Sequence, residues 1–207
     1  MKAVVFVDCQ KDFLRGGVLP FGWPVDDNFQ KVVDFAKQIV AKPEYRIYAT
    51  RDTHEKTKWQ QTSDWVRSED SGEALAKAKP ESGYYATLEG QRLPVEHCVE
   101  GSDGWMVDDR LLDVFGENAT FVNKPTFGSF DLADIIAEDA ADAGEDVDEI
   151  VLLGYDLSIC VISNALLLRA KFPNAKIVIK KDLCGCVTEE TFNAALSVAG
   201  CCQIDVE

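Results

Sequence analysis

The sequence is short of basic residues and of histidine. It has 21 Lys and Arg residues against 36 Asp and Glu, a formal net charge of −15 at pH 7, and only 2 histidines. A chain this acidic lacks the basic face that nucleic acids and anionic lipids require, so we expect neither as a partner. Long hydrophobic runs are also missing. None approaches the roughly 20 residues of a transmembrane helix, which argues against a membrane protein.

A disulfide framework is missing as well. The 7 cysteines are odd in number, and Cys201 and Cys202 are adjacent, so we expect mostly reduced thiols. The apolar run at 3–7 is too short for the core of a signal peptide, and no small-residue cleavage site follows it. We therefore predict a cytoplasmic protein. Cys184 and Cys186 could join the adjacent pair in a metal or redox cluster, but small buried residues are the simpler interpretation.

Short runs rich in β-branched residues are the most regular pattern in the 207 residues. Such runs are typical of strands that are buried on both faces of a sheet. They occur at 3–7, 45–50, 119–123, 149–154, 175–180 and, as a weaker sixth, 201–206. Helical spacing of apolar residues separates them, at 27–40, 132–143, 160–171 and 188–199. This alternation predicts a single α/β domain (1–207) with a parallel sheet covered on both faces.

The segment 51–105 has a different composition. It is polar, rich in Trp, Lys and Ser, and contains Pro80 and Pro94. We interpret it as an insertion over the edge of the sheet, with a lid at about 55–105, rather than as a second domain.

Polar side chains follow four of the predicted strands. Asp8 ends the first, Asp52 and His54 follow the second, Lys124 follows the third, and Cys160 comes shortly after the fourth. Because open parallel sheets place ligands beyond the carboxyl ends of their strands, we expect these side chains to share one rim.

This set of side chains is suited to acyl transfer. A thiol at a helix N-terminus has a lowered pKa, and the Lys124 ammonium would lower the pKa of Cys160 further. Asp8 could take the thiol proton and return it to a leaving group. The backbone amides of Asp156 and Cys160 could face the developing oxyanion. The pattern predicts a nucleophilic cysteine with a carboxylate base.

The two histidines suggest a metal site. Asp52 and His54 are two residues apart, and His97 lies in a segment flanked by Pro and Gly. One carboxylate and two imidazoles form a plausible three-ligand site for Zn²⁺ or Fe²⁺, with positions left for water or substrate. Spacing alone leaves open that both histidines are surface or capping residues.

Five segments match, in order, the motifs of one known family. They are VDCQKDFLRGG (7–17), TRDTHEK (50–56), LPVEHCVEGSDGW (93–105), NKPTFGSF (123–130) and GYDLSICVISNALL (154–167). With these motifs the chain resembles the isochorismatase-like cysteine hydrolases, and among them the nicotinamidase-like amidases. The resemblance implies a three-layer αβα fold around a six-stranded, mostly parallel, doubly wound sheet, and a homo-oligomer, either a dimer or a tetramer.

The resemblance also implies a catalytic role for several residues. Asp8, Lys124 and Cys160 would form the triad, with Cys160 attacking an amide to give a thioester and ammonia. A cis peptide bond would join Tyr155 to Asp156 at the oxyanion site.

The same resemblance implies residues that bind the metal and the substrate. A divalent zinc or iron ion would be held by Asp52, His54 and His97, and could bind a pyridine nitrogen and a water. Phe13 and Leu93 would line the substrate pocket.

Some residues depart from the family pattern. Gln60 stands where some relatives have a further histidine, and Leu93-Pro94 stands where many nicotinamidases have Trp-Pro. Leu157-Ser158 replaces a Thr-Asp pair. A carboxylate at Asp156 would repel an anionic substrate or bind a cationic one.

The sequence thus favours a metal-assisted cysteine amidase that acts on a small carboxamide, with nicotinamide as the first candidate. A metal-free relative that acts on another amide, a carbamoyl compound or an enol ether is the first alternative. A non-catalytic ligand-binding or thiol redox protein on the same fold is the second.

Overall fold

The computed structural model describes residues 1–21, 23, 28–55 and 95–207 of the chain. Its strands are β1 (Lys2–Val7), β2 (Tyr45–Asp52), β3 (Ala119–Lys124), β4 (Glu149–Gly154), β5 (Lys176–Cys184) and β6 (Asp205–Val206). Its helices are α1 (Phe29–Val40), α4 (Asp109–Phe115), α5 (Phe130–Ala143), α6 (Ile162–Lys171) and α7 (Glu189–Cys201). A short 3-10 helix, η1 (Lys11–Phe13), follows β1, and a π turn, η4 (Leu157–Val161), precedes α6.

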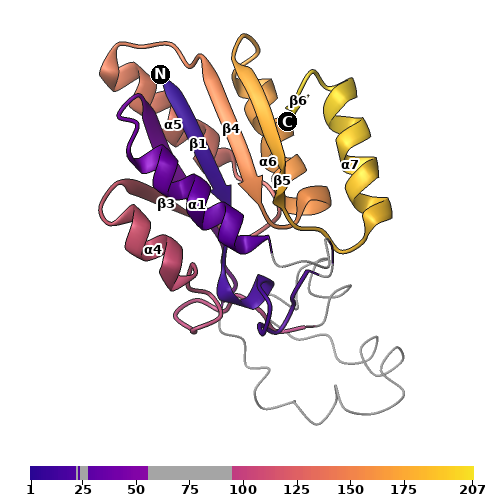
Figure 1. The fold of residues 1–207 in the computed structure, drawn as a ribbon. Coiled ribbons are helices and arrows are strands. Elements are labelled where there is room, and N and C mark those ends of the chain that lie inside the picture. The colour runs from indigo at the N-terminus through magenta and orange to yellow at the C-terminus, as the bar shows by residue number, and fades with distance from the viewer. Residues whose placement is uncertain (22, 24–27, 56–94) are drawn as a thin grey trace, which may run out of the picture.

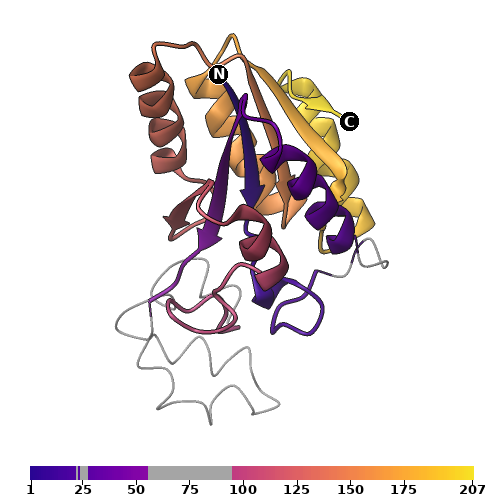
Figure 2. The same cartoon turned by 60° about the vertical axis from the view of Figure 1, so that its left-hand side comes forward.

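The six strands form one sheet in the order β3-β2-β1-β4-β5-β6, and every pair of neighbours is parallel. α1 and α4 cover one face, and α5, α6 and α7 cover the other (Figures 1 and 2). The predicted six-stranded, doubly wound α/β fold is confirmed, and the sheet is parallel throughout. The order of the strands reverses between β1 and β4, which is where such sheets bind ligands.

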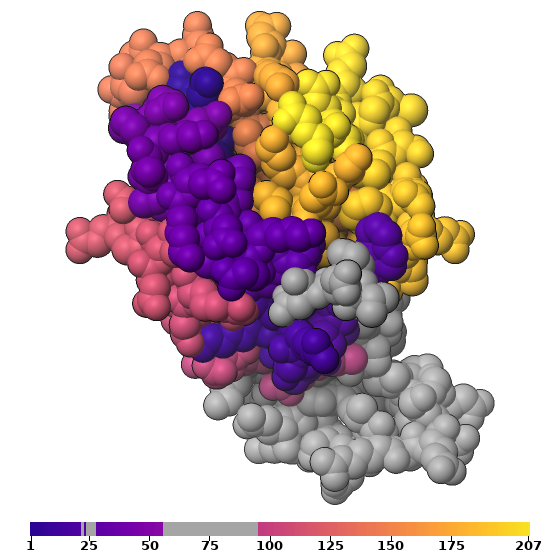
Figure 3. All heavy atoms as spheres, in the orientation of Figure 1, coloured from indigo at the N-terminus to yellow at the C-terminus, as the bar shows by residue number. Residues whose placement is uncertain are grey.

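Burial explains why the central strands read as continuous apolar runs. In β1 and β4 all residues but the first are buried, because helices cover both faces of the sheet. The space-filling view shows α1 on the front surface, between α4 and the C-terminal residues (Figure 3). Among the described residues, no helix combines the length and apolar character needed to cross a bilayer.

The prediction and the structure differ at two elements. The predicted strand 201–206 is wrong for most of its length, because α7 continues through Cys201 and β6 holds only Asp205–Val206. α4 was not predicted. It has only 7 residues, and Asp108 caps its N-terminus with a side chain that accepts a hydrogen bond from the Arg110 amide.

Most of the predicted lid at 55–105 lies outside the described residues. Its described end, 95–105, packs against the turn that follows β1. The Asp12 amide there donates to the Gly104 carbonyl at 3.0 Å, and the Lys11 amide donates to the Met106 carbonyl at the same distance. This part of the insertion is therefore tied to the strand that carries Asp8.

Candidate active site and metal centre

Asp8, Lys124 and Cys160 meet at the carboxyl ends of the central strands. The Lys124 ammonium lies 2.6 Å from Asp8 Oδ2 and 3.5 Å from Cys160 Sγ. All three side chains are buried, Lys124 and Asp8 completely. The predicted convergence of these three side chains is therefore present in the structure, with the ammonium between the carboxylate and the thiol.

Thr50 on β2 holds Asp8 in place. The Thr50 hydroxyl donates to Asp8 Oδ1 at 2.6 Å, and the Asp8 amide donates back to the Thr50 carbonyl at 3.2 Å. Asp8 has a φ of 49°, a left-handed conformation that Asp and Asn adopt more readily than most residues. Sequence reasoning missed Thr50, and its place near the end of a strand next to Asp8 was the available signal.

Asn164 fixes η4 (Leu157–Val161), the candidate nucleophile turn, which carries Cys160. Its amide group donates to the Cys160 carbonyl at 2.8 Å and to the Phe127 carbonyl at 3.1 Å, and its oxygen accepts from the Ser129 amide at 3.0 Å. It is fully buried on α6. Asn164 was also missed, although a polar residue on the buried face of a predicted helix is a recognisable signal.

Burial dominates the electrostatics of this cluster. It raises the pKa of the Cys160 thiol well above its usual value, against the attraction of Lys124, and the carboxylates of Asp8 and Asp52 raise it further. The predicted lowering of this pKa is therefore wrong, because the depth of the site outweighs the helix terminus and the nearby ammonium. The thiol rests in its neutral form and needs a base.

Lys124 remains charged in spite of its burial. Desolvation disfavours the ammonium, but the carboxylates of Asp8 and Asp52 outweigh it and raise the pKa of Lys124. Burial also raises the pKa of Asp8, which Lys124 offsets only in part. Asp8 is thus a carboxylate with raised proton affinity beside a thiol, which suits it to act as a base.

Asp52, His54 and His97 form a compact buried cluster beside the triad. Their ligand atoms all lie within 4.8 Å of one another. Asp52 Oδ2 lies 3.0 Å from His54 Nε2 and 3.4 Å from His97 Nε2. The Val95 carbonyl lies 2.6 Å from His97 Nδ1, which leaves Nε2 facing Asp52.

The donor set of this cluster fits a divalent metal. Asp52 Oδ1 is buried and accepts no hydrogen bond from the residues that the structure describes, although Lys124 Nζ lies 3.8 Å away. Burial opposes ionisation of Asp52, but Lys124, His54 and His97 outweigh it and hold its pKa well below the usual value. An ionised carboxylate with two imidazoles is the ligand type that zinc and iron prefer.

Asp156 does not face a substrate in the way the sequence suggested. The bond from Tyr155 to Asp156 is cis, at the position that the family resemblance implies. The Asp156 carboxylate accepts from the Val187 amide at 2.7 Å, the Ser158 hydroxyl at 2.7 Å and the Cys186 thiol at 3.3 Å. Because protein donors occupy both oxygens, the carboxylate holds the nucleophile turn rather than a charged ligand.

Aromatic rings connect the histidine cluster to the nucleophile turn. The ring of Phe13 lies 5.7 Å from that of His97 and 5.1 Å from that of Phe21. Phe21 in turn stacks on Tyr155 at 5.9 Å with a 3° interplanar angle. Phe13 therefore lies beside the histidine cluster, and its place in the wall of a substrate pocket stays a prediction. Leu93 and Gln60 lie outside the described residues.

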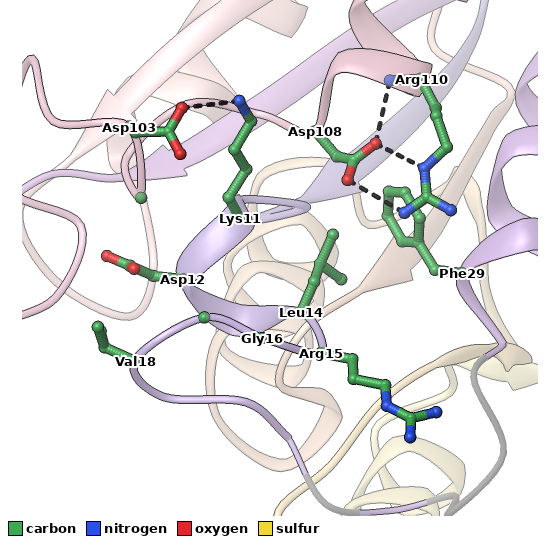
Figure 4. Close-up of a pocket in the computed structure, with 12 residues that line it drawn as sticks. Lys11, Asp12, Leu14, Arg15, Gly16, Val18, Phe29, Asp103, Asp108 and Arg110 are labelled. Atoms are coloured by element: carbon green, nitrogen blue, oxygen red, sulfur yellow. Dashed lines mark hydrogen bonds and ion pairs between the residues drawn. The ribbon is translucent and has the colours of Figure 1, made fainter.

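Two cavities open beside the turn after β1. One, of about 360 Å³, is lined by Lys11, Asp103, Arg110 and Phe29 among others (Figure 4). Two of its cations are paired, since Lys11 Nζ lies 2.8 Å from Asp103 and Arg110 bonds Asp108 through two nitrogens.

The second cavity, of about 370 Å³, is lined by His97, Glu96 and Asp12 among others. It therefore borders the metal cluster. Neither of the two cavities includes Cys160 among its described lining residues.

The protein has a doubly wound α/β fold, with Asp8, Lys124 and Cys160 buried where the strand order reverses. The isochorismatase domain model matches residues 2–203, so the chain belongs to the isochorismatase family. No curated protein matches it in sequence.

Three solved structures with similar folds are amidases of pyridine or pyrazine compounds. The pyrazinamidase of Pyrococcus horikoshii in complex with zinc is 20% identical, with a TM-score of 0.68 over 100% of this chain and 98% of that one. The nicotinamidase/pyrazinamidase of Bacillus subtilis is 20% identical, with a TM-score of 0.71 over 99% and 98%. The yeast nicotinamidase bound to the inhibitor nicotinaldehyde is 18% identical, with a TM-score of 0.69 over 100% and 99%.

Proposed function

We propose that the protein is a metal-assisted cysteine amidase that hydrolyses a small carboxamide, nicotinamide first, to the carboxylic acid and ammonia. The observation that carries the proposal is the position of the Lys124 ammonium, 2.6 Å from Asp8 and 3.5 Å from Cys160. Membership of the isochorismatase family supports the reaction class. The amidases with similar folds support an aromatic amide as the substrate.

In the first step the Cys160 sulfur attacks the amide carbonyl and its proton passes to Asp8. The base is needed because the buried thiol is neutral at rest. The amides of Asp156 and Cys160 donate to the oxyanion. Lys124 stays protonated and stabilises the sulfur as its charge develops.

In the second step the tetrahedral intermediate collapses. Asp8 returns its proton to the departing nitrogen, ammonia leaves, and a thioester to Cys160 remains. A water then attacks the thioester, with Asp8 accepting its proton. The C–S bond breaks, the acid leaves, and the proton returns to the thiol.

Asp52, His54 and His97 are the residues that would hold a zinc or iron ion. When bound, such an ion would supply a Lewis acid that binds a pyridine nitrogen and polarises a water. Phe13 lies against His97 and would offer an apolar surface to the substrate ring.

Ammonia release from nicotinamide by the zinc-loaded protein tests the proposal. We expect release on the order of 1 s⁻¹ or faster, a rate typical of enzymes, and none from a Cys160→Ala variant. A panel of aliphatic and carbamoyl amides should follow if nicotinamide is inert. Release that persists in Cys160→Ala would refute the cysteine mechanism.

A further inference from the structure

The side chain of Gln10 pairs with the main chain of Asp52. Gln10 Nε2 donates to the Asp52 carbonyl at 2.8 Å, and the Asp52 amide donates to Gln10 Oε1 at 2.7 Å. Nε2 also donates to the Trp105 carbonyl at 2.9 Å. Gln10 is fully buried, so both N–H groups and the oxygen of its amide are used inside the protein. The side-chain amide of Gln10 thus bonds both the carbonyl and the amide of Asp52, as the main chain of a neighbouring strand would.

Asp12 makes the corresponding contact to the segment that carries His97. Its Oδ2 accepts from the Cys98 amide, one residue beyond His97, at 2.8 Å. Cys98 has a φ of 47°, an unusual conformation that this bond helps to hold. Gly104 lies against the same carboxylate, and a Cβ there would be 2.1 Å from Asp12 Oδ1. Asp12 is 8% exposed.

Through these contacts the segment 8–12 reaches both the proposed triad and the histidine cluster. Asp8, Gln10 and Asp12 alternate along the turn after β1. Asp8 belongs to the proposed triad, while the other two fix the backbone on either side of the histidine cluster. Residues 8–12 therefore contact both the proposed triad and the backbone that carries the proposed metal ligands.

We propose that Gln10 and Asp12 are positioning residues for the metal centre. Gln10 places Asp52, and Asp12 places His97, although neither offers the metal an atom. This inference rests on the proposed metal site. Groups that orient metal ligands through hydrogen bonds typically change metal affinity by about 10–100-fold when removed.

Zinc affinity, measured by competition with a chromophoric chelator, tests the inference. We expect Gln10→Met and Asp12→Ala each to bind zinc about 10–100-fold more weakly than the wild-type chain. Asp12→Asn should stay close to wild type, because an amide oxygen can still accept from the Cys98 amide. Gln10→Asn, which keeps the amide but is one methylene shorter, replaces Gln10→Met if that variant does not fold.

Lys11→Met is the matched control. Lys11 lies between the two positions, but its side chain reaches Asp103 and Asp109 at the surface. We expect unchanged zinc affinity, since exposed ion pairs contribute little. The absorption spectrum of the cobalt-substituted protein gives a second readout. Its d–d bands should change in Gln10→Met and not in Lys11→Met, because they report the geometry of the ligands.

The outcomes separate two kinds of failure. Folded Gln10→Met and Asp12→Ala proteins that bind zinc as tightly as the wild-type chain would overturn the inference alone. A lowered melting temperature with unchanged zinc affinity would have the same meaning, since it would mark a purely structural role. If the wild-type chain binds no zinc, the metal part of the proposed function fails and the inference fails with it.

Discussion

At the scale of single residues, Lys124 has the largest number of roles in the site, because it contacts two carboxylates and one thiol. It is a completely buried ammonium that lies 2.6 Å from one carboxylate and 3.8 Å from another. Its charge allows Asp8 and Asp52 to remain in the interior. The same ammonium lies 3.5 Å from the Cys160 sulfur, so its structural role and its proposed chemical role belong to one group.

Lys124→Met should therefore damage both stability and activity. Removal of one partner leaves buried charge without compensation, which typically costs about 3–5 kcal/mol of unfolding free energy. Urea denaturation and ammonia release measure the two effects. Lys171→Met is the control, because Lys171 pairs with Asp134 at 2.7 Å on the surface, and we expect it to lose at most about 1 kcal/mol. Equal losses in both variants would contradict this account of Lys124.

Metal removal should impair substrate positioning rather than the nucleophile. Asp52, His54 and His97 lie beside the triad, and Cys160 and Asp8 do not belong to the cluster. We expect a chelated, verified metal-free protein to show a raised KM for nicotinamide, while the rate of Cys160 alkylation by iodoacetamide stays the same. Unchanged kinetics after metal removal would count against a role for the ion.

The convergence of Asp8, Lys124 and Cys160 could be predicted because each follows a strand, and the ends of parallel strands meet at one edge of the sheet. The direction in which the pKa of Cys160 shifts could not be predicted. It depends on how deeply the thiol is buried, and the spacing of residues in the sequence does not reveal that depth. The contacts of Asp156 were also hidden. Its partners Cys186 and Val187 are about 30 residues away and come close only once β5 has paired with β4.

At the scale of elements, the nucleophile turn depends on the connection between β5 and α7. Asp156 bonds the Val187 amide, and the Leu157 amide donates to the Gly185 carbonyl at 2.8 Å. The turn is therefore fixed from outside as well as by Asn164 from α6. Such support is needed because a short π turn has few hydrogen bonds of its own.

Asp156→Ala should loosen this turn. It removes the charged acceptor of the Val187 amide, and hydrogen bonds to charged groups contribute about 1.5–3 kcal/mol. We expect a lower melting temperature and a reduced kcat, because Cys160 is carried by the same turn. Asp113→Ala, an exposed position on α4, should leave both unchanged. A folded Asp156→Ala enzyme with wild-type kcat would show that the turn holds its shape without the carboxylate.

The strands were predictable because two-sided burial produces apolar runs that no surface element shows. α4 could not be predicted, because its 7 residues are too few to show a helical period of apolar residues. The last predicted strand failed for a related reason. Cys201 and Cys202 are apolar in either structure, and the helical pattern that precedes them continues through Cys201.

At the scale of the whole molecule, burial of thiols links stability to alkaline pH. Burial raises the pKa of Cys184 to about 12, and it raises the pKa of Cys9 well above its usual value. In the unfolded chain both thiols ionise near pH 8.5. Between these values the folded state holds more protons than the unfolded state, so stability falls as pH rises.

We expect the free energy of unfolding to decline from about pH 8.5 upward, by at most about 1.4 kcal/mol per pH unit for each such thiol. Urea titrations at pH 7.5, 8.5 and 9.5 measure the slope. A Cys184→Ala variant should show a shallower decline than the wild-type chain, whereas Cys201→Ala, which removes an exposed thiol, should not. If the free energy of unfolding falls with pH equally in all three proteins, the buried thiols are not the cause of the decline.

The pairing of β1 with β4 has a consequence for how the protein comes into being. Lys2 lies beside Glu149 and Val7 beside Gly154, so the central pair joins segments about 147 residues apart. Asp8 extends the first strand of that pair, and Cys160 follows the second. During synthesis Asp8 and Cys160 cannot meet until the chain has grown past Cys160. Parallel sheets built from such distant contacts fold slowly, so we expect the apolar strand β1 to lack its partner β4, and to be prone to aggregation, until most of the chain has been made.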